Sequence, residues 1–140
     1  MVGEPVDGLR AAIDESTRFY RATDVPAHRR LEAIVLGTGW GGNGYTTADQ
    51  AAELVHLLAL APGARLLDVG AGRGWPGNFL ATISGCDVVL VDLPQNTVHQ
   101  GVERAGNAGS GSVTGVVGSA TALPFRAESF DAVVHTDVLC

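Results

Sequence analysis

Two acidic residues and a run of glycines carry the chemistry that this sequence can support. Asp68 stands inside an otherwise apolar run and is followed at once by glycines, within the segment Arg65–Gly77 (RLLDVGAGRGWPG). A second apolar run, Val88–Asp92, ends in another acid 22 residues after Gly70. Glycines between a strand and a helix let a ligand approach bare backbone N–H groups, and an acid at this distance can accept hydrogen bonds from ribose hydroxyls. The spacing therefore predicts a nucleoside site.

The negative charge of Asp68 indicates which class of nucleoside the site can bind. A buried carboxylate is costly unless it has a partner. A dinucleotide is a poor partner, because its pyrophosphate needs the same amides and is repelled by an anion. An ammonium or sulfonium group is a good one. A nucleoside with a cationic tail therefore suits both Asp68 and Asp92.

Three separated motifs resemble the class I S-adenosylmethionine-dependent methyltransferases, over residues 63–140. Leu66–Gly74 is similar to the first motif of that family, whose acid and glycines bind the amino-acid end of the cofactor. Val91–Leu93 is similar to the second motif, in which the acid binds the ribose and the next residue lies against adenine. Residues 118–134 resemble the third and fourth motifs, which flank adenine and supply the fourth strand.

The resemblance implies a set of cofactor-binding residues and contains one departure. The implied set is Asp68, Gly70, Ala71, Gly72, Gly74, Trp75, Asp92, Leu93, Ser119, Ala120 and Thr136. Ser119 stands where the family often has an acid that accepts from the adenine amino group, and a neutral hydrogen bond is weaker than a charge-assisted one. Two alternatives stay open: Asp68 as a buried acid that caps local amides, and Asp92 as the cap of the next helix.

A base for methyl transfer is expected at the carboxyl end of the fourth strand. The candidates are His135 and Asp137, which should face the acceptor. Their alternative roles are a structural histidine and a helix N-cap.

Composition sets the class of protein. A chain of 140 residues can form one domain with a real core. A net charge of −6 with scattered arginines argues against a nucleic-acid surface. No window approaches the ~18 apolar residues of a membrane span. Cys86 and Cys140 lack metal-ligand spacing, so we expect no metal, unpaired thiols and a cytoplasmic location.

The elements that must position these residues alternate between helix and strand. Helices are expected over 7–22, 26–36, 47–60, 76–84 and 94–105, and strands over 66–69, 88–92, 113–117 and 130–136. This alternation predicts an α/β fold, a doubly wound, Rossmann-like parallel sheet of strand order 3-2-1-4, with N-terminal helices outside it. We divide the chain into a helical cap with a glycine-rich loop, residues 1–46, and a cofactor-binding core, residues 47–140.

The glycine-rich loop has two interpretations. Five of the eight residues from Gly37 to Gly44 are glycine, and Trp40 and Tyr45 are large side chains that need a place to pack. The loop is either a lid over substrate or cofactor, or a solvent loop with docked aromatic residues. The second glycine-rich segment, Gly106–Ser112, is expected to be a flexible connector.

The sequence stops soon after the fourth strand, whereas the family fold continues, so we interpret the chain as C-terminally truncated. Its fourth strand would then leave an apolar edge, residues 132–134, that could pair with a second copy. The expected function is S-adenosylmethionine-dependent methyl transfer to a small-molecule or lipid-like acceptor. The alternatives are an NAD(P)-binding oxidoreductase domain, because residues 72–77 also spell G-x-G-x-x-G, and a non-catalytic interaction protein.

Overall fold

A computed structural model describes residues 4–106 and 111–138. Most of the expected connector and Cys140 lie outside these residues. The elements in chain order are α1 (Glu4–Thr23), α2 (Pro26–Val35), α3 (Ala48–Leu57), β1 (Arg65–Val69), α4 (Gly77–Ser84), β2 (Asp87–Asp92), α5 (Gln95–Ala105), β3 (Val113–Val117) and β4 (Ala132–Val134). Each helix and strand expected from the sequence is present, with shifts at some ends.

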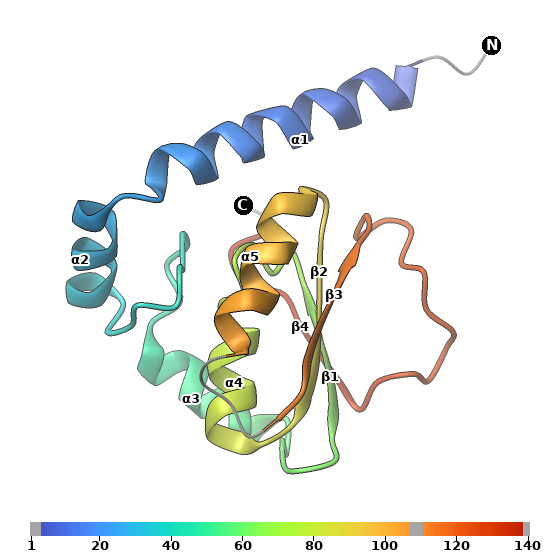
Figure 1. Cartoon of the computed structure of the whole chain (residues 1–140). Helices are drawn as coiled ribbons and strands as arrows, with labels where there is room; N and C mark the ends of the chain where they lie inside the picture. Colours follow the sequence, from blue (N-terminus) through green and yellow to red (C-terminus); the bar gives the residue numbers. More distant parts are fainter. Residues whose placement is uncertain (1–3, 107–110, 139–140) are drawn as a thin grey trace.

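The four strands form one parallel sheet of order β3-β2-β1-β4, as predicted (Figure 1). In register, Asp68 of β1 lies beside Leu90 of β2 and Val134 of β4. Parallel strands bring their carboxyl ends to one edge of the sheet, so the residues that follow β1, β2, β3 and β4 meet there.

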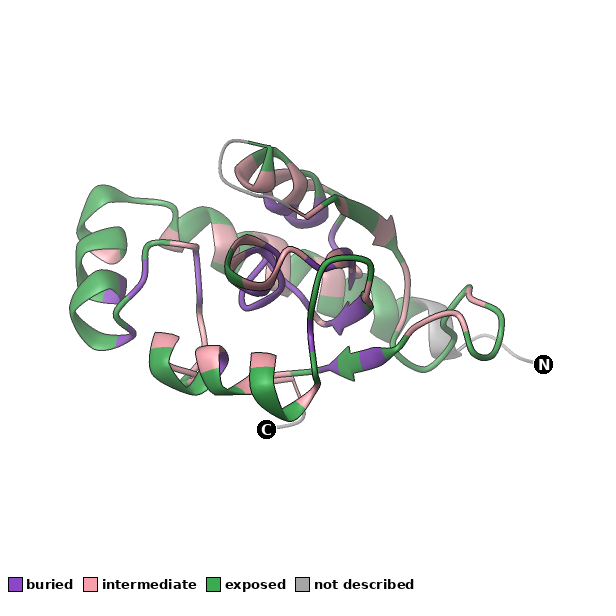
Figure 2. Cartoon of the chain, turned by 90° about the horizontal axis from the view of Figure 1, so that it is seen from below, coloured by how far each residue is buried: buried purple, intermediate pink, exposed green. Residues whose placement is uncertain are grey.

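Alternation along the strands separates two hydrophobic clusters. Leu66, Val88 and Leu90 point to the face that α3, α4 and α5 cover (Figure 1). Leu67, Val69 and Val91 point to the other face, where Phe125 and Phe130 of the segment between β3 and β4 pack. Buried residues are concentrated in β1, β2 and β4, in the turn after β1 and in α4, whereas α1 and α2 are largely exposed (Figure 2).

Helix α3 begins as the sequence predicts and ends earlier. The Thr47 side chain accepts from the Gln50 amide, and the Gln50 side chain accepts from the Thr47 amide, which completes the capping box. Ala59 has φ 50°, and this left-handed residue turns the chain so that Leu60 enters the core. Leu57, the last residue of α3, is 70% exposed.

Strand β4 is shorter than the predicted 130–136. It pairs with β1 only from Ala132 to Val134, because β1 leaves the sheet at the turn that begins at Gly70. The residues after Val134 are thereby free to leave the strand, and Asp137 adopts a φ of 57°. Among the described residues, no helix is both long enough and apolar enough to cross a membrane.

Candidate functional site

The turn after β1 presents backbone to the carboxyl edge of the sheet. The amides of Gly70 and Ala71 both donate to the Val91 carbonyl, at 2.8 and 3.1 Å, which fastens the turn to β2. Gly70 and Gly72 have φ of 71° and 52°, in the left-handed region that favours glycine. The sequence therefore places glycine where the backbone itself requires it.

Asp68 is buried beneath this turn. Its Oδ2 accepts from the Gly77 amide at 2.8 Å, at the start of α4, and its Oδ1 has no hydrogen-bond partner. Burial raises the pKa of Asp68 to about 8; the hydrogen bond from Gly77 opposes this rise and the charge of Asp92 adds to it. The capping of a local amide, which the sequence left as an alternative, is thus present in the structure.

Asp92 closes β2 and organises the same edge. Its Oδ2 accepts from the Gly72 amide and its Oδ1 from the Leu93 amide, both at 2.7 Å. Burial raises its pKa, and these two hydrogen bonds oppose the rise. The Gly118 amide donates to the Asp92 carbonyl at 3.0 Å, so Ser119 follows directly at this edge.

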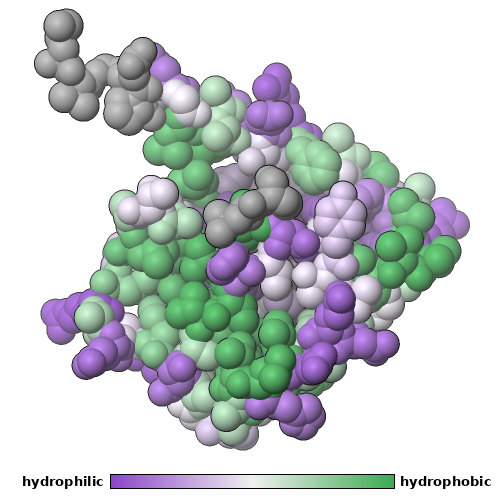
Figure 3. Space-filling view, turned by 180° about the vertical axis from the view of Figure 1, so that it is seen from behind, coloured by the Kyte–Doolittle hydropathy of each residue, from purple (hydrophilic) through white to green (hydrophobic). Residues whose placement is uncertain are grey.

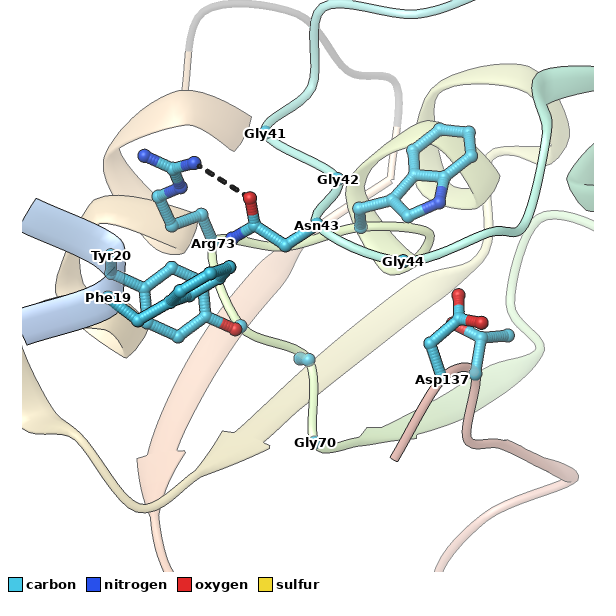
Figure 4. A pocket seen from close by; sticks show the side chains of 13 residues that line it. Phe19, Tyr20, Gly41, Gly42, Asn43, Gly44, Gly70, Arg73 and Asp137 are labelled. Atoms are coloured by element: carbon cyan, nitrogen blue, oxygen red, sulfur yellow. Dashed lines mark hydrogen bonds between the residues drawn. The ribbon is translucent and has the colours of Figure 1, made fainter. Parts of the chain in front are cut away.

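A cavity of about 190 Å³ opens beside the turn (Figure 4). Six of the predicted site residues line it: Gly70, Ala71, Gly72, Trp75, Thr136 and Asp137. The remaining lining residues are Phe19, Tyr20, Gly41, Gly42, Asn43, Gly44 and Arg73. Whole small-molecule sites usually measure about 300–1,000 Å³, so this cavity can hold one end of a ligand.

Several predicted residues lie outside this cavity. Asp92, Leu93, Ser119 and Ala120 follow β2 and β3 along the same sheet edge. Their position suits the other end of an extended ligand. The Ser119 hydroxyl lies 2.8 Å from that of Thr121, so it already has one local partner.

The two candidate bases differ in position. Asp137 lines the cavity, and its Oδ2 accepts from the Thr46 amide at 3.2 Å and the Thr46 hydroxyl at 3.0 Å. His135 is exposed and does not line the cavity. The structure therefore brings only Asp137 to the turn.

The glycine-rich loop covers the cavity and is fastened on two sides. The buried Glu32 of α2 accepts from the amides of Gly41 and Gly42 through Oε1, at 2.7 and 3.0 Å. At the far end of the loop, the Trp75 indole donates to the Thr46 carbonyl at 3.1 Å. The loop thus forms a wall of the site.

Helix α1 supplies the second part of the cover. The Tyr20 hydroxyl lies so close to Gly72 that a Cβ at Gly72 would strike it. The buried Arg73 guanidinium lies 5.4 Å from the centre of the Tyr20 ring and 3.6 Å from the Asp24 carboxylate, and it donates to the Asn43 side chain at 3.4 Å (Figure 4). Arg73 therefore joins the turn, the helix and the loop.

Sequence reasoning did not single out Tyr20, Asn43 and Arg73 as site residues. Their contacts join segments 30 to 50 residues apart, which no local pattern reveals. One signal was available: Arg73 is a charged residue inside a glycine turn, and such a residue needs a partner when the turn is buried.

The charges at the site define the ligand that fits. Asp68 and Asp92 both have raised pKa values, and no ion pair among the described residues reaches either of them. The orphaned Oδ1 of Asp68 and the bare turn at Gly70–Gly72 are suited to a ligand whose end carries a positive charge. A nucleoside with a cationic amino-acid tail meets these conditions.

Comparison with known proteins agrees with this chemistry. The profile of the family described as "Methyltransferase domain" matches residues 67–140. A solved S-adenosylmethionine-dependent methyltransferase from Thiobacillus denitrificans, in complex with S-adenosyl-L-homocysteine, superposes with a TM-score of 0.59 at 28% identity, over 80% of this chain and 44% of that one.

Curated relatives are also named as methyltransferases. A 24-methylenesterol C-methyltransferase 2 from Oryza sativa subsp. japonica is 32% identical over 94% of this chain and 41% of its own length. A botryococcene C-methyltransferase from Botryococcus braunii is 32% identical over 81% of this chain and 34% of its own length. The chain thus spans well under half the length of the curated relatives it matches. Motifs, sheet order and family profile coincide: the chain belongs to the methyltransferase domain family, among the class I S-adenosylmethionine-dependent methyltransferases.

Proposed function

We propose that this chain binds S-adenosylmethionine along the carboxyl edge of β1 and β2 and serves methyl transfer to a small-molecule or lipid-like acceptor. The observation that carries the proposal is the pair Asp68 and Asp92, two acids with raised pKa values beside a glycine turn. The positive charge of the cofactor would offset the cost of keeping these carboxylates ionised.

Each predicted residue takes a role in this proposal. The turn at Gly70–Gly72 receives the amino-acid end in the cavity, and Gly74 gives the turn the positive φ it needs. Asp92 accepts from the ribose hydroxyls with lone pairs that its two local hydrogen bonds leave free. Leu93, Ser119 and Ala120 flank adenine, and Trp75 and Thr136 line the amino-acid end.

The protein's part in the reaction is to position the acceptor and take its proton. When bound, the cofactor supplies an electrophilic methyl group on a sulfonium, which the acceptor attacks in line. Water is excluded from the cavity by Tyr20, Asn43 and the loop at Gly41–Gly44. The same residues hold the acceptor next to the methyl group of the bound cofactor. Asp137 is the better-placed base, because it lines the cavity; His135 would need to move to reach it.

The class of acceptor is supported by the relatives and by the cover of the site. The relatives include enzymes named for squalene, botryococcene and sterols. Phe19 and Tyr20 of α1 add aromatic side chains to the cover of the site. These features favour an apolar acceptor with a reactive carbon or a small polar end.

The organisation and partners form part of the same proposal. The cap is residues 1–46 and the cofactor-binding core residues 47–140. The buried, unpaired Cys86 suits a reducing, cytoplasmic environment. The acidic net charge argues against a nucleic-acid partner, and the exposed edge of β4 is the proposed homodimer surface.

No observation favours an oxidoreductase. In the sequence G-x-G-x-x-G of residues 72–77, Gly77 is required by packing whatever the ligand, since a Cβ there would meet Asp68 at 2.7 Å and Leu90 at 2.8 Å, so this glycine does not select a dinucleotide. A dinucleotide would also bring its pyrophosphate beside two acids.

Calorimetric titration of the chain with S-adenosylmethionine, S-adenosyl-L-homocysteine and NADH tests the proposal. We expect saturable binding of the two adenosyl compounds only. Asp92→Ala should weaken that binding by on the order of 10- to 100-fold, the cost of a lost charge-assisted hydrogen bond. Circular dichroism of the variant controls for folding. Binding of NADH alone, or of none of the three by a folded chain, would contradict the proposal.

A further inference from the structure

In α2 the buried residue is an acid, Glu32, and the three large apolar residues of the helix are exposed. Glu32 is 4% exposed, whereas Leu31, Ile34 and Val35 are 56%, 81% and 61% exposed. A helix on the surface of a globular protein normally shows the opposite arrangement. Seen from behind, hydrophobic side chains gather beside hydrophilic ones on the surface at the end of the molecule where α2 lies (Figure 3).

The orientation of α2 is fixed by its hydrogen bonds to the loop that lines the cavity. The two hydrogen bonds from Gly41 and Gly42 to Glu32 hold one side of α2 against the loop. Helical geometry then places Ile34 on the side opposite Glu32. Leu31 and Val35 lie at the flanks of the helix, where they border the same small cavity as Glu32 and remain more than half exposed. Val25, just before the helix, extends this apolar face and is also exposed. The face defined by Val25, Leu31, Ile34 and Val35 is called the α2 face below.

The segment that contains the α2 face, residues 16–36, has a net charge of opposite sign from that of the whole chain. Residues 16–36 contain four arginines and two acids, in a chain of net charge −6. The four arginines, Arg18, Arg21, Arg29 and Arg30, are all exposed. Asp24 offsets one of them at the surface, because it pairs with Arg29 at 2.8 Å, whereas Glu32 is buried. Among the described residues, Arg18, Arg21 and Arg30 take part in no ion pair.

We infer that the α2 face docks on an anionic lipid bilayer. Exposed apolar side chains beside arginines are the pattern of a helix that lies in the membrane interface, where apolar groups enter the acyl boundary and cations meet anionic headgroups. A second copy of the chain is a poorer occupant. An isologous pair would bring the same positive end of both copies together.

Docking at α2 would bring the bilayer to the cover of the site. Glu32 joins α2 to the loop that lines the cavity, so this wall of the cavity and the bilayer would be neighbours. A lipid-like acceptor could then pass from the bilayer to the cavity without crossing water. In this respect the inference rests on the proposed function.

Vesicle flotation tests the inference. The probes are vesicles made of equal parts of phosphatidylcholine and phosphatidylglycerol, and vesicles of phosphatidylcholine alone. We expect the wild-type chain to float with the anionic vesicles and the double variant Leu31→Gln/Ile34→Gln to partition on the order of tenfold less. Leu57→Gln is the matched control, because Leu57 is equally exposed on α3, and it should float like the wild type.

Two flotation results would overturn the inference. Either the wild-type chain does not float with the anionic vesicles, or the double variant floats as well as Leu57→Gln does. A third overturning result would come from sedimentation equilibrium: if the wild type is a dimer and Ile34→Gln dissociates it, the occupant of the α2 face is a second copy of the chain. Binding of S-adenosyl-L-homocysteine separates the two proposals. A double variant that binds this ligand but no vesicles supports docking through α2, and wild-type flotation without ligand binding would defeat the proposed function alone.

Discussion

Asp68 couples the fold to pH at the scale of a single residue. Its pKa rises from 3.8 to about 8 in the folded chain, so between these values the folded chain holds a proton that the unfolded chain has released. The stability that protonation contributes is complete below pH 3.8 and is lost as the pH rises through about 8. The loss is at most about 1.4 kcal/mol per pH unit.

The variant Asp68→Asn isolates this effect, because an amide resembles the protonated acid and does not ionise. We expect the free energy of unfolding of the wild type to fall relative to that of Asp68→Asn between about pH 5 and about pH 8. Urea titrations at several pH values measure this difference. Asp87→Asn is the control: hydrogen bonds from Ser112 lower the pKa of Asp87, so its contribution changes only at more acidic pH. Parallel curves for the wild type and Asp68→Asn would contradict the account.

Single site residues could be predicted from the sequence when their roles depend on residues next to them along the chain. The glycines at 70 and 72 and the acids at 68 and 92 follow from a strand-turn-helix pattern, in which position along the chain nearly determines position in space. Arg73 could not be assigned, since its partners Tyr20 and Asn43 come from separate segments. Its environment exists only after the cap has packed on the turn.

The positions of the helices and loops around the cavity depend on a few contacts, each of which can be removed by one substitution. Asp137 holds Thr46 at the end of the glycine-rich loop. Asp137→Gly removes the carboxylate and suits the φ of 57° at this position. We expect hydrogen exchange of the Thr46 amide to accelerate by on the order of tenfold, the effect of a lost hydrogen bond.

Asp137→Asn is the matched control, because its amide oxygen still accepts from Thr46 and asparagine tolerates a positive φ. It should leave the exchange of the Thr46 amide near the wild-type rate. Equal exchange in Asp137→Gly and the wild type would mean that Asp137 does not fasten the loop.

The capping box of α3 can be tested in the same manner. Thr47→Ala removes the acceptor for the Gln50 amide and should lower the free energy of unfolding by about 1 kcal/mol. Glu53→Ala, an exposed position in the same helix, should change it by less than about 0.5 kcal/mol. Chemical denaturation of the wild type and the two variants measures both changes. Equal stability of Thr47→Ala and the wild type would contradict a stabilising role for the capping box.

The spacing of apolar residues predicted where the helices lie in the sequence, but not which side of each helix faces the protein. In α2 the spacing of Leu31, Ile34 and Val35 correctly indicates one apolar side. Which side meets the protein is decided by Glu32 and the loop amides, and these contacts are not part of the helix pattern. The early end of α3 likewise depends on how Leu60 reaches the core.

At the scale of the whole molecule, both edges of the sheet are open among the described residues, at β3 and at β4. β4 is an outer strand of the sheet, and we expect pairing through its free edge. Val133 is the exposed residue of this strand, at 54%. Sedimentation equilibrium should show a mass that rises with concentration and a monomer for Val133→Lys. Thr114→Lys, on the exposed side of β3, should still associate. A wild type that is monomeric at all concentrations would contradict this expectation.

The sheet order could be predicted because right-handed crossovers and alternating elements leave few arrangements. How the cap lies on the core could not. It depends on contacts such as that between Asp137 and Thr46, 91 residues apart, and on side chains that find partners only in the folded chain.

The central claim is that the turn after β1 and the acid after β2 together hold an adenosyl ligand. Nuclear magnetic resonance of the isotope-labelled chain, titrated with S-adenosyl-L-homocysteine, tests it most directly. The account predicts saturable shifts of the amides of Gly70, Gly72 and Leu93, and none with NADH. A folded chain whose turn amides do not move, or whose shifts lie only away from the carboxyl edge of the sheet, would contradict it.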